Sequence, residues 1–109
     1  MKEIKVNIQP DPILPWTNTI KDTEEEIEIT VFDGEERVDV SGMTAELKWR
    51  KPTRETMTVR TEIKDKKVIT TTSKEETDIT GQALCELTLK KDKVESKAYF
   101  FVYVEDIRQ

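Results

Sequence analysis

The sequence predicts an all-β fold, either an antiparallel sandwich or a barrel of about seven or eight short strands. Three observations predict it. Apolar residues alternate with polar ones over many short segments, which is the pattern of half-buried strands. Turn residues separate these segments at roughly regular spacing. No segment has the apolar spacing of an amphipathic helix, and many short strands without helices are typical of sandwiches and barrels.

Alternating segments occur along most of the chain. The expected strands are residues 3–9, 27–32, 43–50, 57–63, 68–72, 83–90 and 97–105, with a short apolar run at Val38 and Val40. Asp33-Gly34 predicts a hairpin turn, because glycine accepts positive φ without a steric penalty. Pro52 ends the third of these strands, since it has no amide to donate. Ser73 and Glu76 match a capping box, which here supports at most one helical turn.

Residues 10–16 form a proline-rich segment between the first two strands. Three prolines in six residues fix φ and remove backbone donors, so the segment is expected to be extended, at a sheet edge or in a linker. Its apolar side chains are Ile13, Leu14 and Trp16. They are expected to fold back over an open end of the core or to form an arm that binds a partner.

The strand at 97–105 is apolar on both faces. Phe100, Val102 and Val104 form one row, and Tyr99, Phe101 and Tyr103 form the other. Such a strand is either covered on both sides within the domain or docks against something outside it. Phenol oxygens suit a half-wetted face. The candidate protein contacts are therefore Ile13, Leu14, Trp16, Tyr99, Phe101 and Tyr103.

The core is expected to form between two layers of strands. Leu47, Trp49, Leu87 and Phe100 lie on apolar rows and are expected inside it. For Trp49, which ends such a row, a core position is favoured over ligand stacking. Cys85 is the lone cysteine and is expected to be a buried apolar side chain rather than a reactive thiol. The 109 residues are expected to form a single domain, with residues 1–22 packed on or beside it.

Composition argues against several classes of function. Acidic residues number 23 and basic residues 18, which gives a net charge of −5 and no phosphate-binding field. Nucleic acid and acidic membrane surfaces are therefore not expected as partners. No apolar run approaches the length that a bilayer requires, and the N-terminus does not resemble a signal peptide. Synthesis and folding in a reducing cytosol fit the single cysteine.

Catalysis and cofactor binding are also not expected. The chain has no histidine, which removes the commonest general base and most transition-metal sites. One cysteine cannot build a zinc cluster, and none of the three glycines forms a phosphate loop. Acidic residues cluster at 24–26 and at Asp33, Glu35, Glu36 and Asp39. These are interpreted as solvated turns, with weak calcium binding or carboxylate catalysis as alternatives. No cofactor and no metal are expected.

The middle and the end of the chain resemble a known family. Residues 31–52 contain a short hairpin, an apolar-Asp-apolar run at 38–40, Ser41-Gly42, and a strand that ends in Lys51-Pro52. Residues 80–89 and the aromatic strand 99–104 look like a closing hairpin. Over most of 27–106, the sequence resembles the N-terminal domain of phage baseplate upper proteins of the BppU type. Members commonly continue into a helical linker and a further domain, so the sequence is expected to be a short tail component or one domain of a longer protein.

The resemblance implies an immunoglobulin-like β-sandwich that acts as a structural adaptor in the baseplate or tail tip of a tailed phage or prophage. It implies no catalytic residues. The expected partners are other tail and baseplate proteins, with homo-oligomers in the assembly. The expected location is the virion, after synthesis in the bacterial cytoplasm. The main alternative is a carbohydrate- or cell-surface-binding sandwich, in which exposed aromatic rings stack on sugars. A small glycosidase-like enzyme is a third, weaker hypothesis.

Overall fold

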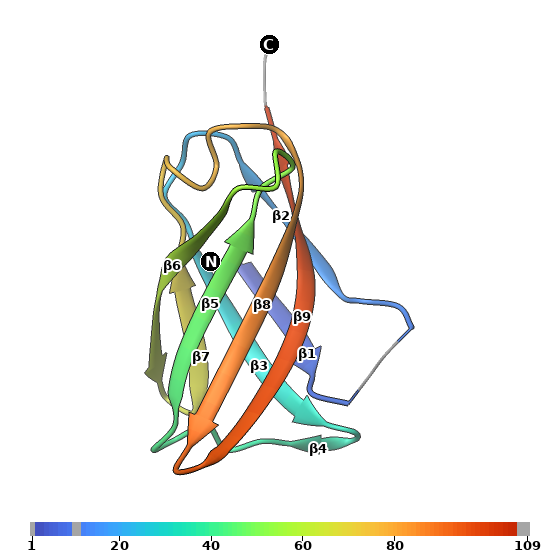
Figure 1. The fold of residues 1–109 in the computed structure, drawn as a ribbon, viewed down its shortest axis with the longest axis vertical. Coiled ribbons are helices and arrows are strands. Elements are labelled where there is room, and N and C mark those ends of the chain that lie inside the picture. Colours follow the sequence, from blue (N-terminus) through green and yellow to red (C-terminus); the bar gives the residue numbers. More distant parts are fainter. Residues whose placement is uncertain (1, 10–11, 107–109) are drawn as a thin grey trace.

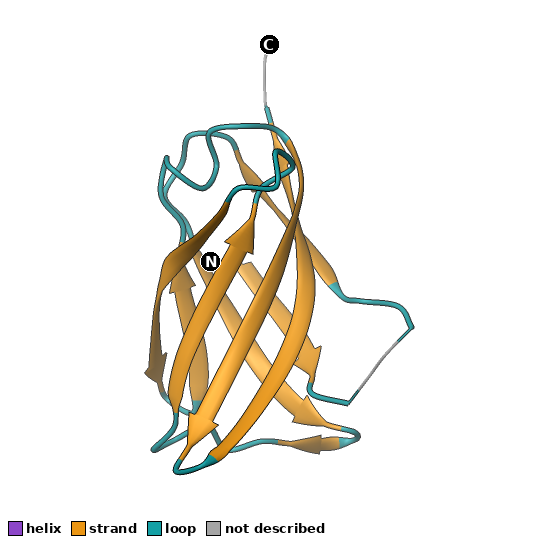
Figure 2. Cartoon of the chain, viewed as in Figure 1, coloured by secondary structure: helices purple, strands orange, loops and turns teal. Residues whose placement is uncertain are grey.

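A computed structural model describes residues 2–9 and 12–106, and within them all regular secondary structure is strand (Figure 2). The described strands are β1 (Lys2–Asn7), β2 (Trp16–Ile20), β3 (Glu26–Asp33), β4 (Glu36–Arg37), β5 (Thr44–Arg50), β6 (Thr56–Lys64), β7 (Lys67–Thr71), β8 (Gly81–Lys91) and β9 (Val94–Glu105). The predicted all-β class is confirmed. Pro10 and Asp11, at the start of the proline-rich segment, lie outside the described residues.

The strands form one continuous sheet that curls into a nearly closed barrel (Figure 1). Their order is β1-β3-β7-β6-β5-β8-β9-β2, and β4 pairs with β3. The strand β6 joins two layers, because its first half pairs with β5 and its second half pairs with β7. On this side every strand has two neighbours. On the other side the order ends at β1 and β2, which have no ladder between them in the described residues.

The expectation of a wholly antiparallel fold is wrong at two places. The strand β1 runs parallel to β3, and β2 runs parallel to β9. Parallel neighbours need a long crossover connection. The connection from β1 to β3 is long because it contains β2, which lies at the opposite end of the strand order. The two layers expected from the sequence are joined through β6 into one curled, mixed sheet. The immunoglobulin-like description therefore stays a prediction.

Two short elements differ from the sequence-based expectation. The strand β2 was not predicted, because its inward side chains are threonines and do not give an apolar alternation. Thr17 and Thr19 are buried, whereas Trp16 and Ile20 at its ends are exposed. The apolar run at 38–40 is not a strand, and the short strand β4 lies just before it.

The predicted core is confirmed. Leu47, Trp49, Leu87 and Phe100 have no exposed surface, and neither has Cys85. Trp49 lies opposite Cys85, which lies opposite Phe100, so three adjacent strands place these side chains side by side on one inner face. Burial of a large apolar side chain contributes roughly 1.5–3 kcal/mol. This row is therefore a main source of stability for the layer formed by β5, β8 and β9.

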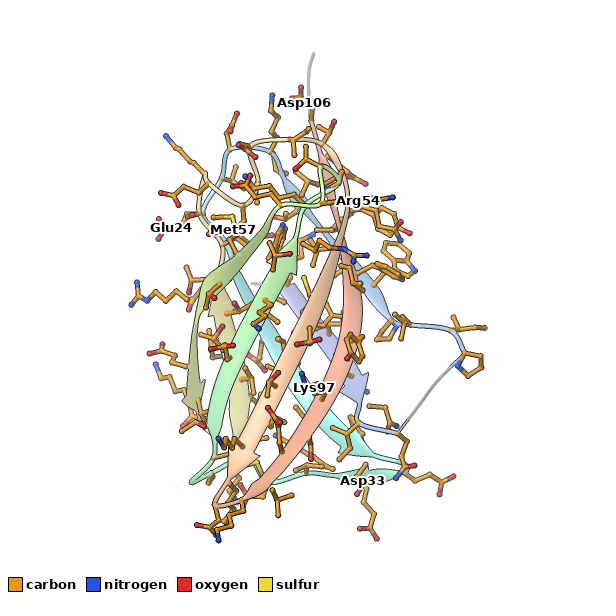
Figure 3. The ribbon with its side chains drawn as sticks, viewed as in Figure 1. Glu24, Asp33, Arg54, Met57, Lys97 and Asp106 are labelled. Atoms are coloured by element: carbon orange, nitrogen blue, oxygen red, sulfur yellow. The ribbon has the colours of Figure 1, made fainter. Side chains whose placement is uncertain are left out.

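Side-chain hydrogen bonds fix the hairpin turn at one end of the barrel. The amide of Asn7 clamps Gly34, since Nδ2 donates to the Gly34 carbonyl at 2.8 Å and Oδ1 accepts from the Gly34 amide at 3.0 Å. Gln9 Nε2 donates to Asp33 Oδ1 at 2.6 Å. Asp33 lies at this end of the molecule and Arg54 at the opposite end (Figure 3). The clamp holds the end of β1 to the turn that follows β3.

Buried charge and close backbone packing fix the opposite end. The Lys51 side chain is 7% exposed and its Nζ lies 3.0 Å from Asp78 Oδ1 and 3.6 Å from Glu55 Oε2. The hydrogen bond to Asp78 raises the pKa of the Lys51 ammonium. Next to this pair, Gly81 has φ +129°, and a Cβ there would lie 2.8 Å from Pro52 Cγ. The loops before β6 and before β8 are therefore tightly joined.

The predicted capping box forms in part, in a turn of the loop 72–80, where the Ser73 hydroxyl accepts from the Glu75 amide at 3.3 Å rather than from that of Glu76. The Glu76 carboxylate accepts hydrogen bonds from the backbone amide and the hydroxyl of Ser73. Thr77 Oγ1 donates to the Ser73 carbonyl at 2.8 Å, and the Thr77 carbonyl accepts from the Asp22 amide at 2.9 Å. The turn thus ties this loop to the one that precedes β3.

Candidate docking surface

The outer face of β2, β9 and β8 carries an apolar band. Alternation along β9 turns Phe100 inward and Phe101 outward. Phe101 lies opposite Trp16 of β2 on one side and opposite Leu84 of β8 on the other. Tyr99 and Tyr103 are on the same face of β9. We call these five side chains the aromatic face: Trp16, Leu84, Tyr99, Phe101 and Tyr103.

The rings of Trp16 and Tyr103 pack against each other on this face. Their centroids are 5.6 Å apart and their planes are at 85°, an edge-to-face arrangement that aromatic pairs favour. Trp16 nevertheless remains 62% exposed and Tyr103 37% exposed. Gln82 Nε2 donates to the Tyr103 hydroxyl at 3.3 Å. The two rings therefore hold a fixed arrangement while both remain accessible to solvent.

The proline-rich segment does not bury its apolar side chains over the core. Ile13 is 80% exposed, whereas Leu14 and Pro15 are half-buried. The carbonyl of Pro15 accepts a hydrogen bond from the Phe101 amide at 3.0 Å, which attaches the end of the segment to β9. The expectation that the segment folds back over the core is therefore wrong for Ile13 and Trp16. Its alternative role, a partner-binding arm, stays a prediction.

An open groove lies where the barrel is not closed. The strand β2 pairs only with Phe101–Glu105 of β9, so residues 94–100 of β9 have no ladder partner on that side in the described residues. The groove has a volume of about 780 Å³. We call it the seam groove. Its lining residues are Lys5, Val6, Asn7, Ile8, Gln9, Ile13, Leu14, Pro15, Trp16, Phe32, Lys97 and Tyr99.

Positive charge borders the seam groove. Its described lining includes Lys5 and Lys97 but no carboxylate. Lys97 Nζ donates to Glu86 Oε1 at 3.3 Å, which raises the pKa of Lys97; Figure 3 labels this lysine. Above the groove, Lys2 Nζ donates to Asn18 Oδ1 at 3.0 Å and links β1 to β2. The seam is thus tied at one end and open at the other.

The other groups singled out in the sequence form no assembled chemistry in the described residues. No group of three or more histidine, cysteine, aspartate or glutamate side chains is arranged to hold a metal ion there. Burial raises the pKa of the Cys85 thiol. Asp39 Oδ1 accepts from the Ser41 amide at 3.0 Å, which lowers the pKa of that carboxyl and uses it in the turn. Within the described ranges, no helix is suited to cross a membrane.

Sequence reasoning found most of the aromatic face and missed the groove. Four of its six candidates belong to the aromatic face on the adjacent strands β2 and β9: Trp16, Tyr99, Phe101 and Tyr103. The other two, Ile13 and Leu14, line the groove beside it. Leu84 and Phe32 were not predicted as surface candidates. Each is an isolated apolar residue on the outward face of a strand whose inward face carries the apolar row. None of these placements tests whether the residues contact a partner.

The fold and this surface define a small all-β domain with a half-wetted aromatic face and an open seam. In a comparison of folds, the chain is similar to a solved structure described as the N-terminal domain of phage TP901-1 ORF48, with a TM-score of 0.68. The match covers 95% of this chain and 97% of that one at 11% sequence identity. At this identity the likeness shows a shared fold. No family model matches the chain, and no curated protein matches it.

Proposed function

We propose that this protein is a non-enzymatic structural module of a phage or prophage tail, an adaptor that assembles with neighbouring baseplate or tail proteins. The observation that carries the proposal is the aromatic face, where Trp16 and Tyr103 stay exposed although they pack on each other. Exposed, clustered aromatic side chains are typical of protein interfaces. Leaving these rings exposed to water does not stabilise an isolated monomer.

Two comparisons supply the biological setting of the proposal. The sequence over 27–106 resembles the N-terminal domain of BppU-type baseplate upper proteins. The fold is similar over nearly its whole length to a domain from a phage protein. In the proposal, the protein resides in the virion tail or baseplate, contacts other tail proteins and forms homo-oligomers within the assembly. It acts by binding alone, without a cofactor.

The aromatic face provides the test. We expect the double substitution Trp16→Ala with Tyr103→Ala to leave the melting temperature nearly unchanged, because both side chains are exposed. The same change should weaken self-association, or co-assembly with tail proteins encoded beside it, by about tenfold or more. Light scattering at increasing concentration and co-purification with co-expressed tail proteins measure this.

Val94→Ala is the matched control. Val94 is 68% exposed in the β8–β9 hairpin, outside the aromatic face, so its removal should leave association unchanged. Equal association of the wild type and the double variant would contradict the proposal. A large loss of stability in the double variant would instead assign Trp16 and Tyr103 to the fold.

Carbohydrate binding is a second candidate, favoured by the same exposed rings. Amide side chains lie beside them, since Gln82 contacts Tyr103 and Asn18 is on β2. Aromatic faces with neighbouring amides can stack on sugars and hydrogen-bond their hydroxyls. A glycan array would support this candidate with hits that disappear in Trp16→Ala, and an array without hits would remove it.

A further inference from the structure

We propose that an extended segment of a partner protein, alternating acidic and apolar residues, binds in the seam groove as an added strand along the free half of β9. The inference rests on the proposed assembly role, because it names the kind of segment that a neighbouring protein would supply. It is carried by three features of the groove: an unpaired strand edge, an apolar lining and a local excess of positive charge.

The unpaired edge belongs to the first half of β9. The strand pairs with β8 along Gly81–Lys91, but β2 begins only opposite Phe101. The Phe101 amide donates toward the arm, to the carbonyl of Pro15. Because successive backbone amides of a strand point to opposite sides, those of Lys97 and Tyr99 point the same way, into the seam. An added strand here would continue the ladder that β2 begins.

The lining of the groove suits a strand with one apolar row. Val6 of β1 and Ile8, just beyond the end of β1, form part of one wall, Leu14 and Trp16 form another, and Tyr99 belongs to β9. Peptides that add to a sheet edge gain affinity from main-chain hydrogen bonds and specificity from contacts of alternate side chains. Alternate apolar residues of the incoming segment would pack on these walls.

The charge around the seam selects an acidic segment. The described lining of the groove has two lysines and no carboxylate. Lys97 is paired with Glu86, and on the outer side of the seam Lys67 is paired with Glu28. The excess of positive charge therefore comes from Lys5 and Arg37, which lie near one further carboxylate, that of Glu3. This excess is local, because the whole chain has a net charge of −5. Complementary charge raises association rates and excludes wrong partners, so the alternate residues that face solvent should be glutamate or aspartate.

The test uses the full chain and a capped peptide of about seven residues that alternates glutamate with valine or isoleucine. A second peptide replaces every glutamate with lysine. We expect the acidic peptide to bind about tenfold more tightly by calorimetry. Its binding should slow hydrogen exchange at the amides of Lys97 and Tyr99. An acidic peptide whose backbone is N-methylated at alternate residues should lose binding, because strand addition needs its amides.

Substitutions in the protein assign the charge effect to the seam. Lys5→Glu should weaken the acidic peptide about tenfold, while Lys5→Arg should bind it as the wild type does. The matched control is Lys74→Glu, an exposed lysine in the loop 72–80, away from the residues that line the groove; it should change nothing. Circular dichroism verifies that each variant is folded.

The outcomes separate this inference from the proposed function. No binding at millimolar peptide, equal binding of acidic and basic peptides, or slowed exchange elsewhere would each overturn the inference. Slowed exchange at Lys97 and Tyr99 on raising the protein concentration alone would also overturn it, by showing a second copy as the occupant. If the inference fails while Trp16→Ala with Tyr103→Ala still weakens assembly, the proposed function stands. If that double variant assembles normally, the proposed function fails independently.

Discussion

The two sides of this barrel differ in how completely their strands are paired, although the strands on both sides have alternating sequences. On the closed side, β6 pairs with β5 through its first half and with β7 through its second half, so the strand order continues from one layer to the other without a break. On the open side, the chain leaves β1, passes through the proline-rich segment and returns as β2, which covers only part of β9. Prolines cannot donate to a ladder, and this segment keeps the seam open.

The largest expected difference in stability between the two sides comes from replacing their tryptophans. Trp49 has no exposed surface, and Trp49→Ala should reduce the free energy of unfolding by about 3–5 kcal/mol because it leaves a large cavity. Trp16 is 62% exposed on the open side. Trp16→Ala should change the free energy of unfolding by less than about 1 kcal/mol. Urea denaturation of both variants measures this, and equal losses would contradict the division of the molecule into two sides.

A smaller difference in stability is expected between alanine substitutions at Gly81 and at Gly34. Gly81 has φ +129°, and an added Cβ would lie 2.8 Å from Pro52 Cγ. Gly34 has φ +65° and no atom within 4 Å of the same position. Gly34→Ala should cost about 1–2 kcal/mol from the left-handed backbone alone. Gly81→Ala should cost more, since strain and a clash add. A smaller loss for Gly81→Ala by chemical denaturation would be inconsistent with tight packing of these loops.

The smallest expected difference in stability is between the ion pairs of Lys51 and Lys97, and this difference depends on pH. Hydrogen bonds to Asp78 and Glu86 raise the pKa of Lys51 and Lys97, respectively, above the ordinary 10.5. A raised pKa in the folded state means stability that is complete below the unfolded pKa and is lost as pH rises through the folded pKa. Asp78→Asn should therefore lower the melting temperature by a few degrees at pH 7 and by less above pH 10.5.

Glu86→Gln is the matched control for that experiment. Lys97 and its partner are partly exposed, with side-chain exposures of 44% and 27%, whereas Lys51 is 7% exposed. Solvent screens the exposed pair, so Glu86→Gln should shift the melting temperature less at every pH. A difference between the wild type and Asp78→Asn that grows at high pH would have the wrong sign for this ion pair.

The sequence allowed the strands to be predicted wherever apolar residues take the inward positions. Leu47, Trp49, Leu87 and Phe100 were predicted in the core and are there, because alternation identifies a face without knowledge of the neighbours. The strand β2 escaped prediction, since Thr17 and Thr19 take its inward positions and a proline precedes it. In such a strand, hydropathy carries almost no period.

Strand pairing and the seam groove could not be predicted from the sequence. Alternation is identical for parallel and antiparallel neighbours, so nothing in residues 3–9 indicates that β1 runs parallel to β3. The groove depends on where β2 begins along β9, which is a property of register. The candidate residues of the aromatic face could be predicted, because Tyr99, Phe101 and Tyr103 form the second apolar row of a strand whose first row fills the core.

Hydrogen exchange along β9 in the free protein tests the open seam most directly. In dilute solution, the amides of Ala98 and Phe100, which alternation directs toward β8, should exchange slowly. The intervening amides of Lys97 and Tyr99 should exchange at least about tenfold faster, because in the described residues no strand pairs with β9 on that side before Phe101. The account predicts this fast–slow alternation before Phe101 and its loss from Phe101 onward, where β2 pairs with β9. Uniformly slow exchange along the whole strand would contradict the open seam and every inference drawn from it.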